Sequence, residues 1–163
     1  MIYSQCPYCG HSFQIKRDTF GIARMNPTMD ERLNNGTYFT HQCSQCHQLY
    51  EIEQPFLYRD PKKKYILLLT KQEHIDALPE DEEIIRCQNA QDFIYCYRVK
   101  SQSLDLDLVT RKRNSLERLK QTRVWFDSYD KKNGCLWFDV KGQWAAIPLS
   151  EKEQRVLEGE EQK

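Results

Sequence analysis

Two stretches of the sequence, Cys6-Pro7-Tyr8-Cys9-Gly10 and Cys43-Ser44-Gln45-Cys46-His47, decide how the first part of the chain folds. We call them knuckle 1 and knuckle 2. In each knuckle two residues separate the cysteines, so a tight turn aims both sulfur atoms at one point. Two such turns supply four thiolates, which form the tetrahedral ligand set that Zn²⁺ accepts. The pattern therefore predicts one structural zinc ion per chain, held by Cys6, Cys9, Cys43 and Cys46.

The connection between the knuckles is longer than in the common zinc-ribbon pattern. It has 33 residues between Cys9 and Cys43, whereas about 15–20 residues are usual. A capping-box pattern at residues 28–31 and the stop signal Gly36 predict a short helix over residues 29–34. An inserted loop of this kind costs little entropy, so the longer spacing is still compatible with a zinc site.

Other interpretations use the same cysteines. Iron also binds four thiolates, and the cysteines can stay reduced without metal, since His47 stands where a glycine would bend more easily. The tetrapeptide Cys6-Pro7-Tyr8-Cys9 is also the active-site motif of glutaredoxins, in which it opens a long helix. Here Gly10 interrupts any such helix, so we prefer the metal site. Four sulfur atoms complete a tetrahedron, and we therefore expect no ligand role for the neighbouring His11, His41 and His47.

Hydrophobic periodicity and turn signals predict an α+β fold. We expect strands at 12–16, 37–42, 49–54, 64–70 and 93–99, a turn at 56–64, a helical turn at 83–88, a helix at 103–121 and a helical or frayed tail from residue 150. The turn signals Asn133-Gly134 and Lys141-Gly142 predict a β-meander over 124–129, 135–140 and 143–149. We expect Trp125, Trp137 and Trp144 to line the core of this meander. In this scheme the zinc-ribbon-like region of residues 1–70 nucleates an antiparallel sheet, which strands 64–70 and 93–99 extend. Residues 71–163 form an α+β region packed on it as one domain.

Composition narrows the functional classes. The chain has 163 residues with 24 Lys+Arg and 24 Asp+Glu, and this zero net charge counts against a non-specific nucleic-acid binder. Its longest apolar run, Ile66–Leu69, is too short for a membrane span, and no signal peptide precedes Cys6. We therefore expect a cytoplasmic protein with reduced thiols and no membrane partner. The three further cysteines are expected to pack as small hydrophobic residues: Cys87, Cys96 and Cys135.

The sequence contains none of the common catalytic motifs. We find no nucleophile–base set, no phosphate-binding glycine loop and no dinucleotide fingerprint, so we do not expect an enzyme. Asp105 and Asp107 alternate with leucines, which the solvated edge of a strand explains without chemistry. The leading hypothesis is a non-enzymatic module that binds another protein. The alternative is a nucleic-acid-binding zinc ribbon whose phosphate contacts are Arg59, Lys62, Lys63 and Lys64, with a second basic run at 111–113.

The first half of the chain resembles the CpXC-domain family. The resemblance rests on Cys6-Pro7-Tyr8-Cys9-Gly10-His11, on residues 33–40, on Cys43-Ser44-Gln45-Cys46 and on residues 55–64, and it covers roughly residues 3–70. Knuckle 2 departs from the family pattern with Ser44 for proline and His47 for glycine. The resemblance implies a zinc site at Cys6, Cys9, Cys43 and Cys46 but no particular biochemical activity. It also implies that the C-terminal meander is an addition outside the family's common part.

Overall fold

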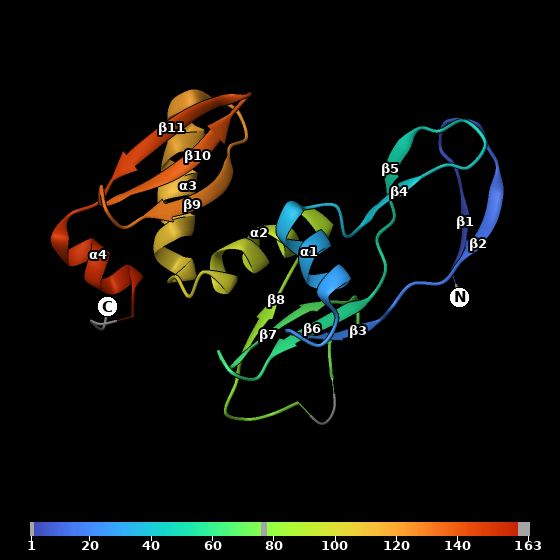
Figure 1. Cartoon of the computed structure of the whole chain (residues 1–163), viewed down its shortest axis with the longest axis horizontal. Coiled ribbons are helices and arrows are strands. Elements are labelled where there is room, and N and C mark those ends of the chain that lie inside the picture. The colour runs from blue at the N-terminus through green and yellow to red at the C-terminus, as the bar shows by residue number, and fades with distance from the viewer. Residues whose placement is uncertain (1, 76–77, 160–163) are drawn as a thin grey trace. The chain divides into compact units, whose positions relative to one another are not determined.

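A computed structural model describes residues 2–75 and 78–159 of the chain (Figure 1). It divides into two compact units, Met1–Ile94 and Tyr95–Lys163, and the division falls inside helix α2 (Ala90–Ser101). The described residues form helices and strands in several sheets, which confirms the predicted α+β class. How residues 1–70 and 71–163 associate stays a prediction.

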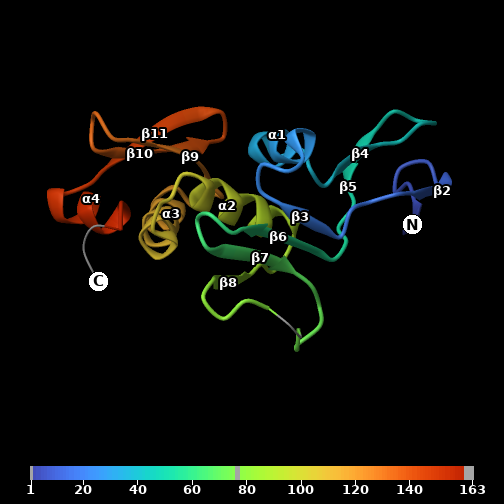
Figure 2. The same ribbon diagram turned by 60° about the horizontal axis from the view of Figure 1, so that its bottom comes forward.

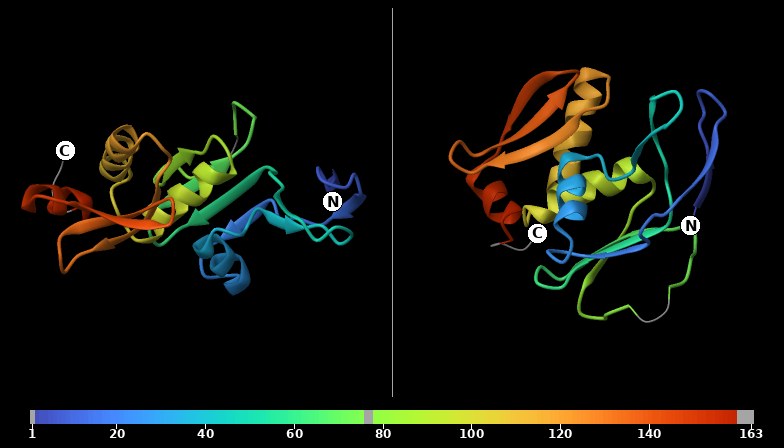
Figure 3. Two further views of the ribbon diagram at one scale, coloured as in Figure 1. Left: turned by 90° about the horizontal axis from the view of Figure 1, so that it is seen from above. Right: turned by 45° about the vertical axis from the view of Figure 1, so that its right-hand side comes forward.

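The two knuckles of unit 1 lie at the tips of two short β-hairpins. The first hairpin pairs β1 (Ile2–Gln5) with β2 (Ser12–Ile15), and the second pairs β4 (Thr40–Gln42) with β5 (Leu49–Glu51). Each hairpin is a separate two-stranded antiparallel sheet. The right-hand view of Figure 3 shows the two hairpins side by side. Strands this short depend on a further constraint for their stability.

The largest sheet of unit 1 is mixed, which the sequence analysis did not predict. Its strands are β3 (Phe20–Ile22), β6 (Phe56–Asp60), β7 (Tyr65–Leu69) and β8 (Glu83–Arg86), in the order β3-β6-β7-β8. The central pair is antiparallel, whereas β3–β6 and β7–β8 are parallel. The expected extension of the hairpins by β7 is therefore wrong. Residues 56–60 are a strand rather than part of a turn, and residues 83–86 are a strand rather than a helical turn.

Helix α1 (Pro27–Asn35) confirms the predicted insertion between the knuckles and lies over the β3 edge of this sheet (Figure 2). Its N-cap is Asn26, which accepts from the Met29 N–H, and not Thr28 as predicted. It ends at Gly36 with φ 82°, the left-handed conformation that glycine adopts without strain. Gly21 permits the close approach, because a Cβ there would overlap the Met29 side chain.

An aromatic cluster joins these elements into one core. The ring of Phe56 lies 4.8 Å from that of Tyr38 and 5.3 Å from that of Phe93, and Phe39 lies 5.6 Å from Phe93. All four side chains are buried. Stacked, tilted and edge-to-face ring pairs of this kind add to the free energy gained from area burial. The cluster therefore fixes the loop after α1 against β6 and the start of α2.

Helix α2 contradicts the strand predicted at residues 93–99. Asn89 accepts from the Asp92 N–H at 2.8 Å, and Asp92 in turn accepts from the Gln88 N–H at 2.9 Å. These bonds satisfy backbone donors that the first turn of a helix leaves open. Ala90 and Phe93 are fully buried, three residues apart on one helix face. The cap and the helical spacing outweigh the strand preference of the aromatic residues in this segment.

Unit 2 contains α3 and a three-stranded antiparallel meander, as predicted. Its further elements are α3 (Leu106–Lys120), β9 (Trp125–Asp130), β10 (Cys135–Val140), β11 (Gln143–Pro148) and α4 (Glu151–Leu157), with strand order β11-β10-β9. Asp105 caps α3 by accepting from the Leu108 N–H, so its assignment to a strand edge is wrong. The tail begins as a helix with a full capping box at Ser150. Cys87, Cys96 and Cys135 are buried, as predicted.

Two of the three tryptophans of the meander, Trp125 and Trp144, do not line its core, contrary to the prediction, and Trp137 is half-buried. The inner face carries Phe126, Leu136 and Phe138, all buried. Trp125 and Trp144 are 43% and 65% exposed on the opposite face. Because side chains alternate along a strand, the burial of Phe126 and Phe138 places the neighbouring tryptophan outward.

A buried carboxylate, Asp60, organises the turn between β6 and β7. It accepts two bonds from the Arg24 guanidinium, the shorter at 2.7 Å, and bonds from the N–H groups of Lys62 and Lys63. Burial raises the pKa of Asp60, but the bonds from Arg24 and Lys63 outweigh this effect and hold the pKa below its ordinary value. Asp60 therefore stabilises the fold above its unfolded pKa of about 3.9, and this contribution is lost as the pH falls.

We predict that Asp60→Ala lowers the free energy of unfolding at pH 7 by about 2–3 kcal/mol, because charged hydrogen bonds are lost and N–H groups lose their acceptor. Urea denaturation measures this change. Glu31→Ala, which removes an exposed acid on α1, is the control and should cost less than about 0.5 kcal/mol. The deficit of Asp60→Ala should shrink below about pH 4. An equal loss in both variants contradicts the role of Asp60.

Candidate metal centre

The four knuckle cysteines meet at one point. Their sulfur atoms all lie within 4.8 Å of one another. Across the two knuckles, Cys6 Sγ lies 3.7 Å from Cys46 Sγ, and Cys9 Sγ lies 3.6 Å from Cys43 Sγ. A Zn–S bond of about 2.3 Å gives a regular tetrahedron with an edge of about 3.8 Å. The sulfur atoms are therefore spaced to hold one metal ion between the two hairpins.

The two knuckles have the same backbone structure. The N–H of the first cysteine donates to the carbonyl five residues on, in Cys6 to His11 and in Cys43 to Gln48. The carbonyl of each first cysteine accepts from the N–H four residues on, at 3.0 Å from Gly10 and 2.9 Å from His47. The internal repeat thus extends beyond the CxxC spacing to the whole turn.

The fifth residue of each knuckle has a positive φ, 75° at Gly10 and 63° at His47. His47 therefore adopts the bend that glycine provides in knuckle 1, at the cost that a left-handed conformation imposes on a residue with a Cβ. A glutamine side chain stabilises each bend. Gln5 donates to the Gly10 carbonyl and Gln42 to the His47 carbonyl, each at 3.1 Å.

Backbone N–H groups face the first sulfur atom of each knuckle. The N–H of Tyr8 lies 3.4 Å from Cys6 Sγ, and the N–H of Gln45 lies 3.4 Å from Cys43 Sγ. The N–H of Cys46 lowers the pKa of Cys43 most, and with Gln45 and the neighbouring thiols it outweighs burial and brings the pKa to about 6. Such bonds stabilise the thiolate, which is the form that binds a metal.

The pKa values of two further thiols, Cys46 and Cys9, are raised, in contrast to that of Cys43. For Cys46 the Gln48 N–H lowers the pKa, but burial and the thiols of Cys6, Cys9 and Cys43 raise it to about 12. The pKa of Cys9 is also raised overall, although the His11 N–H lowers it. Sulfur atoms this close repel one another when charged, so they do not all ionise alone. A bound divalent cation removes this conflict.

The histidines beside the knuckles are not part of the sulfur cluster. Among the described residues, the group of potential ligands at this point contains cysteine only. His41 stacks on Phe13 at 4.7 Å between ring centroids, and Phe13 also stacks with His11 at 6.1 Å. Both rings therefore support the hairpins side by side. Sequence reasoning did not find this stack, although Phe13 and His41 occupy strand positions next to the knuckles.

Some of the basic residues predicted to contact nucleic acid form ion pairs with acidic side chains. The Arg59 guanidinium lies 2.7 Å from the buried Glu82 carboxylate. The turn of Lys62, Lys63 and Lys64 is exposed, but its first two N–H groups bind Asp60. In the second basic run, Lys112 pairs with Glu153 at 2.6 Å. Acidic partners therefore compensate Arg59 and Lys112, whereas the turn of Lys62, Lys63 and Lys64 stays exposed.

Comparison with known proteins gives one match. A family model described as CpXC protein matches residues 4–131 of the chain. The match continues through α2 and α3 to β9, so the expectation that the resemblance ends near residue 70 is wrong; β10, β11 and α4 follow it. No curated protein and no solved structure is similar enough to count as a match. In the described part of the chain, every helix is too short or too polar to cross a membrane.

The two knuckle bends predict opposite effects of substitution. Gly10→Ala should lower the free energy of unfolding of the metal-loaded protein by about 1 kcal/mol, because alanine is strained at positive φ. His47→Gly should leave it unchanged or raise it by up to about 1 kcal/mol, because the strain is removed. Guanidinium denaturation with and without added zinc measures both, with Ser12→Ala as the control. Destabilisation by His47→Gly as large as that of Gly10→Ala contradicts the assigned role of the bends.

Proposed function

The chain belongs to the CpXC protein family, and we propose that it is a non-enzymatic zinc-binding protein of the cytoplasm, in which a structural zinc ion stabilises a protein-interaction module. The observation that carries the zinc assignment is the gathering of four sulfur atoms within 4.8 Å of one another, with the Cys6–Cys46 and Cys9–Cys43 distances close to the edge length of a zinc tetrahedron. The metal joins two hairpins whose knuckles lie far apart in the sequence.

The donor set supports a structural role for the metal. Catalytic zinc sites keep a coordination position open for water or substrate, whereas sites with four cysteines are closed. Cys6 and Cys43 are buried, so two of the four sulfur atoms are shielded from solvent. Metal binding of this type supplies about 10–16 kcal/mol towards folding at neutral pH, which suits hairpins too short to be stable alone.

The outer face of the meander in unit 2 supports an interaction role. Asp139 of β10 pairs with Trp125 of β9 on one side and with Trp144 of β11 on the other. The row therefore presents two exposed indoles around one carboxylate, and the Arg123 guanidinium lies 5.4 Å from the Trp125 ring. Tryptophan and arginine are enriched in the residues that dominate protein interfaces. We name Trp125, Asp139 and Trp144 the tryptophan row.

The alternative of nucleic-acid binding has less support in the geometry. The ion pairs Arg59–Glu82 and Lys112–Glu153 neutralise part of each basic run. Retention on immobilised single-stranded or duplex DNA at low salt, with release as salt rises, is the behaviour that the alternative requires. We expect no such retention.

The first prediction of this proposal concerns the metal. Freshly purified, reduced protein should contain about one zinc per chain by elemental analysis, and a chelator should unfold the hairpins. Cys43→Ser should lose the zinc because one of four ligands is missing. Cys135→Ser is the matched control, since Cys135 is a buried cysteine of unit 2, and it should keep the zinc. Protein without metal, or with iron in place of zinc, contradicts the assignment.

The second prediction concerns the partner surface. Trp144→Ala and Trp125→Ala should each weaken recovery of a specific protein partner from native cell extract by about tenfold or more, because truncated interface tryptophans commonly cost over 1 kcal/mol. Leu119→Ala, which removes another exposed apolar side chain of unit 2, should leave recovery unchanged. If all three variants recover the partner as the wild type does, the tryptophan row is not the contact surface.

A further inference from the structure

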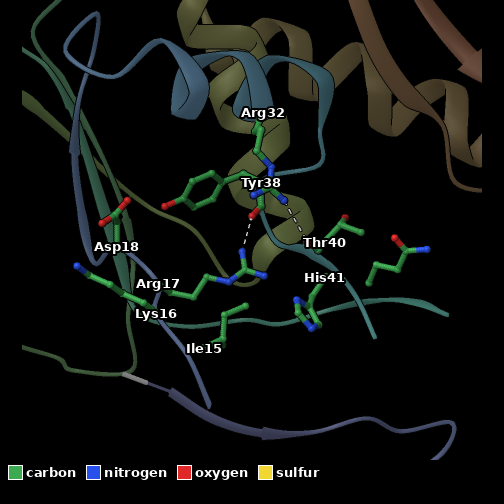
Figure 4. A pocket seen from close by; sticks show the side chains of 9 residues that line it. Ile15, Lys16, Arg17, Asp18, Arg32, Tyr38, Thr40 and His41 are labelled. Atoms are coloured by element: carbon green, nitrogen blue, oxygen red, sulfur yellow. Dashed lines mark hydrogen bonds between the residues drawn. The ribbon is translucent and has the colours of Figure 1, made fainter. Parts of the chain in front are cut away.

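A cationic pocket lies in unit 1, beside the second hairpin, and plays no part in metal binding. It has a volume of about 360 Å³ and is lined by residues from the end of β2 and the loop after it, from α1, and from β4 and the segment before it. We call it the arginine pocket. The lining residues used below are Lys16, Arg17, Asp18, Arg32, Tyr38 and His41 (Figure 4).

Two guanidinium groups converge in this pocket. In Figure 4 the side chains of Arg17 and Arg32 approach the Tyr38–Thr40 backbone from opposite sides. Arg17 donates to the Tyr38 carbonyl at 2.9 Å, and Arg32 donates to the carbonyls of Thr37 and Thr40 at 2.7 and 2.9 Å. These bonds hold both arginines in place before any ligand arrives, which lowers the entropy cost of binding.

The carbonyl partners do not neutralise the two charges. Within residues 2–75 and 78–159, neither Arg17 nor Arg32 forms an ion pair with a carboxylate. Burial lowers the pKa of Arg17 most, and the positive charge of Arg32 lowers it further. The Nε atom of Arg17 is buried without a hydrogen-bond partner. The arrangement therefore holds two like charges close together, at a cost that a bound anion would offset.

The remaining lining groups add to this positive balance. Lys16 contributes a third cation and Asp18 the one carboxylate of the lining. Burial raises the pKa of Tyr38 most, the Asp18 charge raises it further, and the pKa reaches about 12. Three basic side chains against one acidic side chain favour a ligand with two negative charges over a simple carboxylate.

We propose that the arginine pocket binds the phosphate group of a small phosphate monoester. Guanidinium groups donate forked hydrogen bonds that match phosphate oxygens, and they stay charged at every physiological pH. The volume of about 360 Å³ exceeds the need of a phosphate group alone, so the organic part of the ester lies in the same pocket, against Tyr38 and His41. The pocket shares no residue with the zinc ligands or with the tryptophan row.

The test measures binding of phenyl phosphate and of inorganic phosphate to the zinc-loaded full chain by calorimetry and ³¹P NMR. Phenyl phosphate should bind more tightly than inorganic phosphate because its ring occupies the rest of the pocket. Arg32→Gln should weaken binding of phenyl phosphate by about tenfold or more, since one guanidinium is lost. Zinc content and the urea midpoint of Arg32→Gln establish whether that variant is folded.

Two further variants leave both arginines intact. Lys16→Glu should weaken phenyl phosphate binding, and Asp18→Asn should strengthen it, each by about threefold to tenfold, because they shift the pocket charge in opposite directions. Lys71→Gln, which removes a lysine outside the pocket, should have no effect. The proposal is overturned if phenyl phosphate does not bind, if the Lys16 and Asp18 variants bind like the wild type, or if only a polymeric phosphodiester such as oligothymidylate binds.

Discussion

The arrangement of the two hairpins of unit 1 depends on the meeting of four sulfur atoms, two from each knuckle. Each hairpin has strands of only three or four residues and forms its own sheet, so neither contributes a large apolar core. Without a cation the thiols compete, because the pKa of Cys43 falls to about 6 while that of Cys46 rises to about 12. The divalent metal that we propose would replace this competition with a link between segments that the 33-residue connection separates.

Hydrogen bonds from the two arginines of the arginine pocket connect the first hairpin and α1 to the second hairpin. Arg17 follows β2 and Arg32 belongs to α1, and both donate to carbonyls of the segment that enters β4. The same segment carries Tyr38 and Phe39, which belong to the aromatic core. The four-sulfur cluster, the arginine pocket and the core of unit 1 are thus neighbours along one stretch of chain. Removing the metal should loosen the pocket wall at Thr40 and His41.

Local signals in the sequence predicted part of the fold, and tertiary contacts decided the rest. The CxxC spacing predicted the four-sulfur cluster, and Gly36 predicted the end of α1. The turns at Gly134 and Gly142 predicted the meander. The sequence does not predict β3 and β8, because each pairs in parallel with a strand distant in the chain and parallel pairing leaves no hairpin signal. It does not predict β6 because the turn signal Asp60-Pro61 was extended over residues 56–64. The sequence of α2 predicts a strand because it is rich in aromatic residues, and the helix-capping signal at Asn89 received too little weight. The tryptophans were placed inside, although Phe126 and Phe138 fill that face.

The central claim is that one zinc ion is held by the four knuckle sulfur atoms. X-ray absorption at the zinc K-edge of the purified full chain tests it most directly, since it reports the metal, its ligand atoms and their distances together. The account predicts a single shell of four sulfur ligands at about 2.3 Å. A shell in which nitrogen or oxygen from a histidine, carboxylate or water replaces one or more sulfur atoms would contradict it.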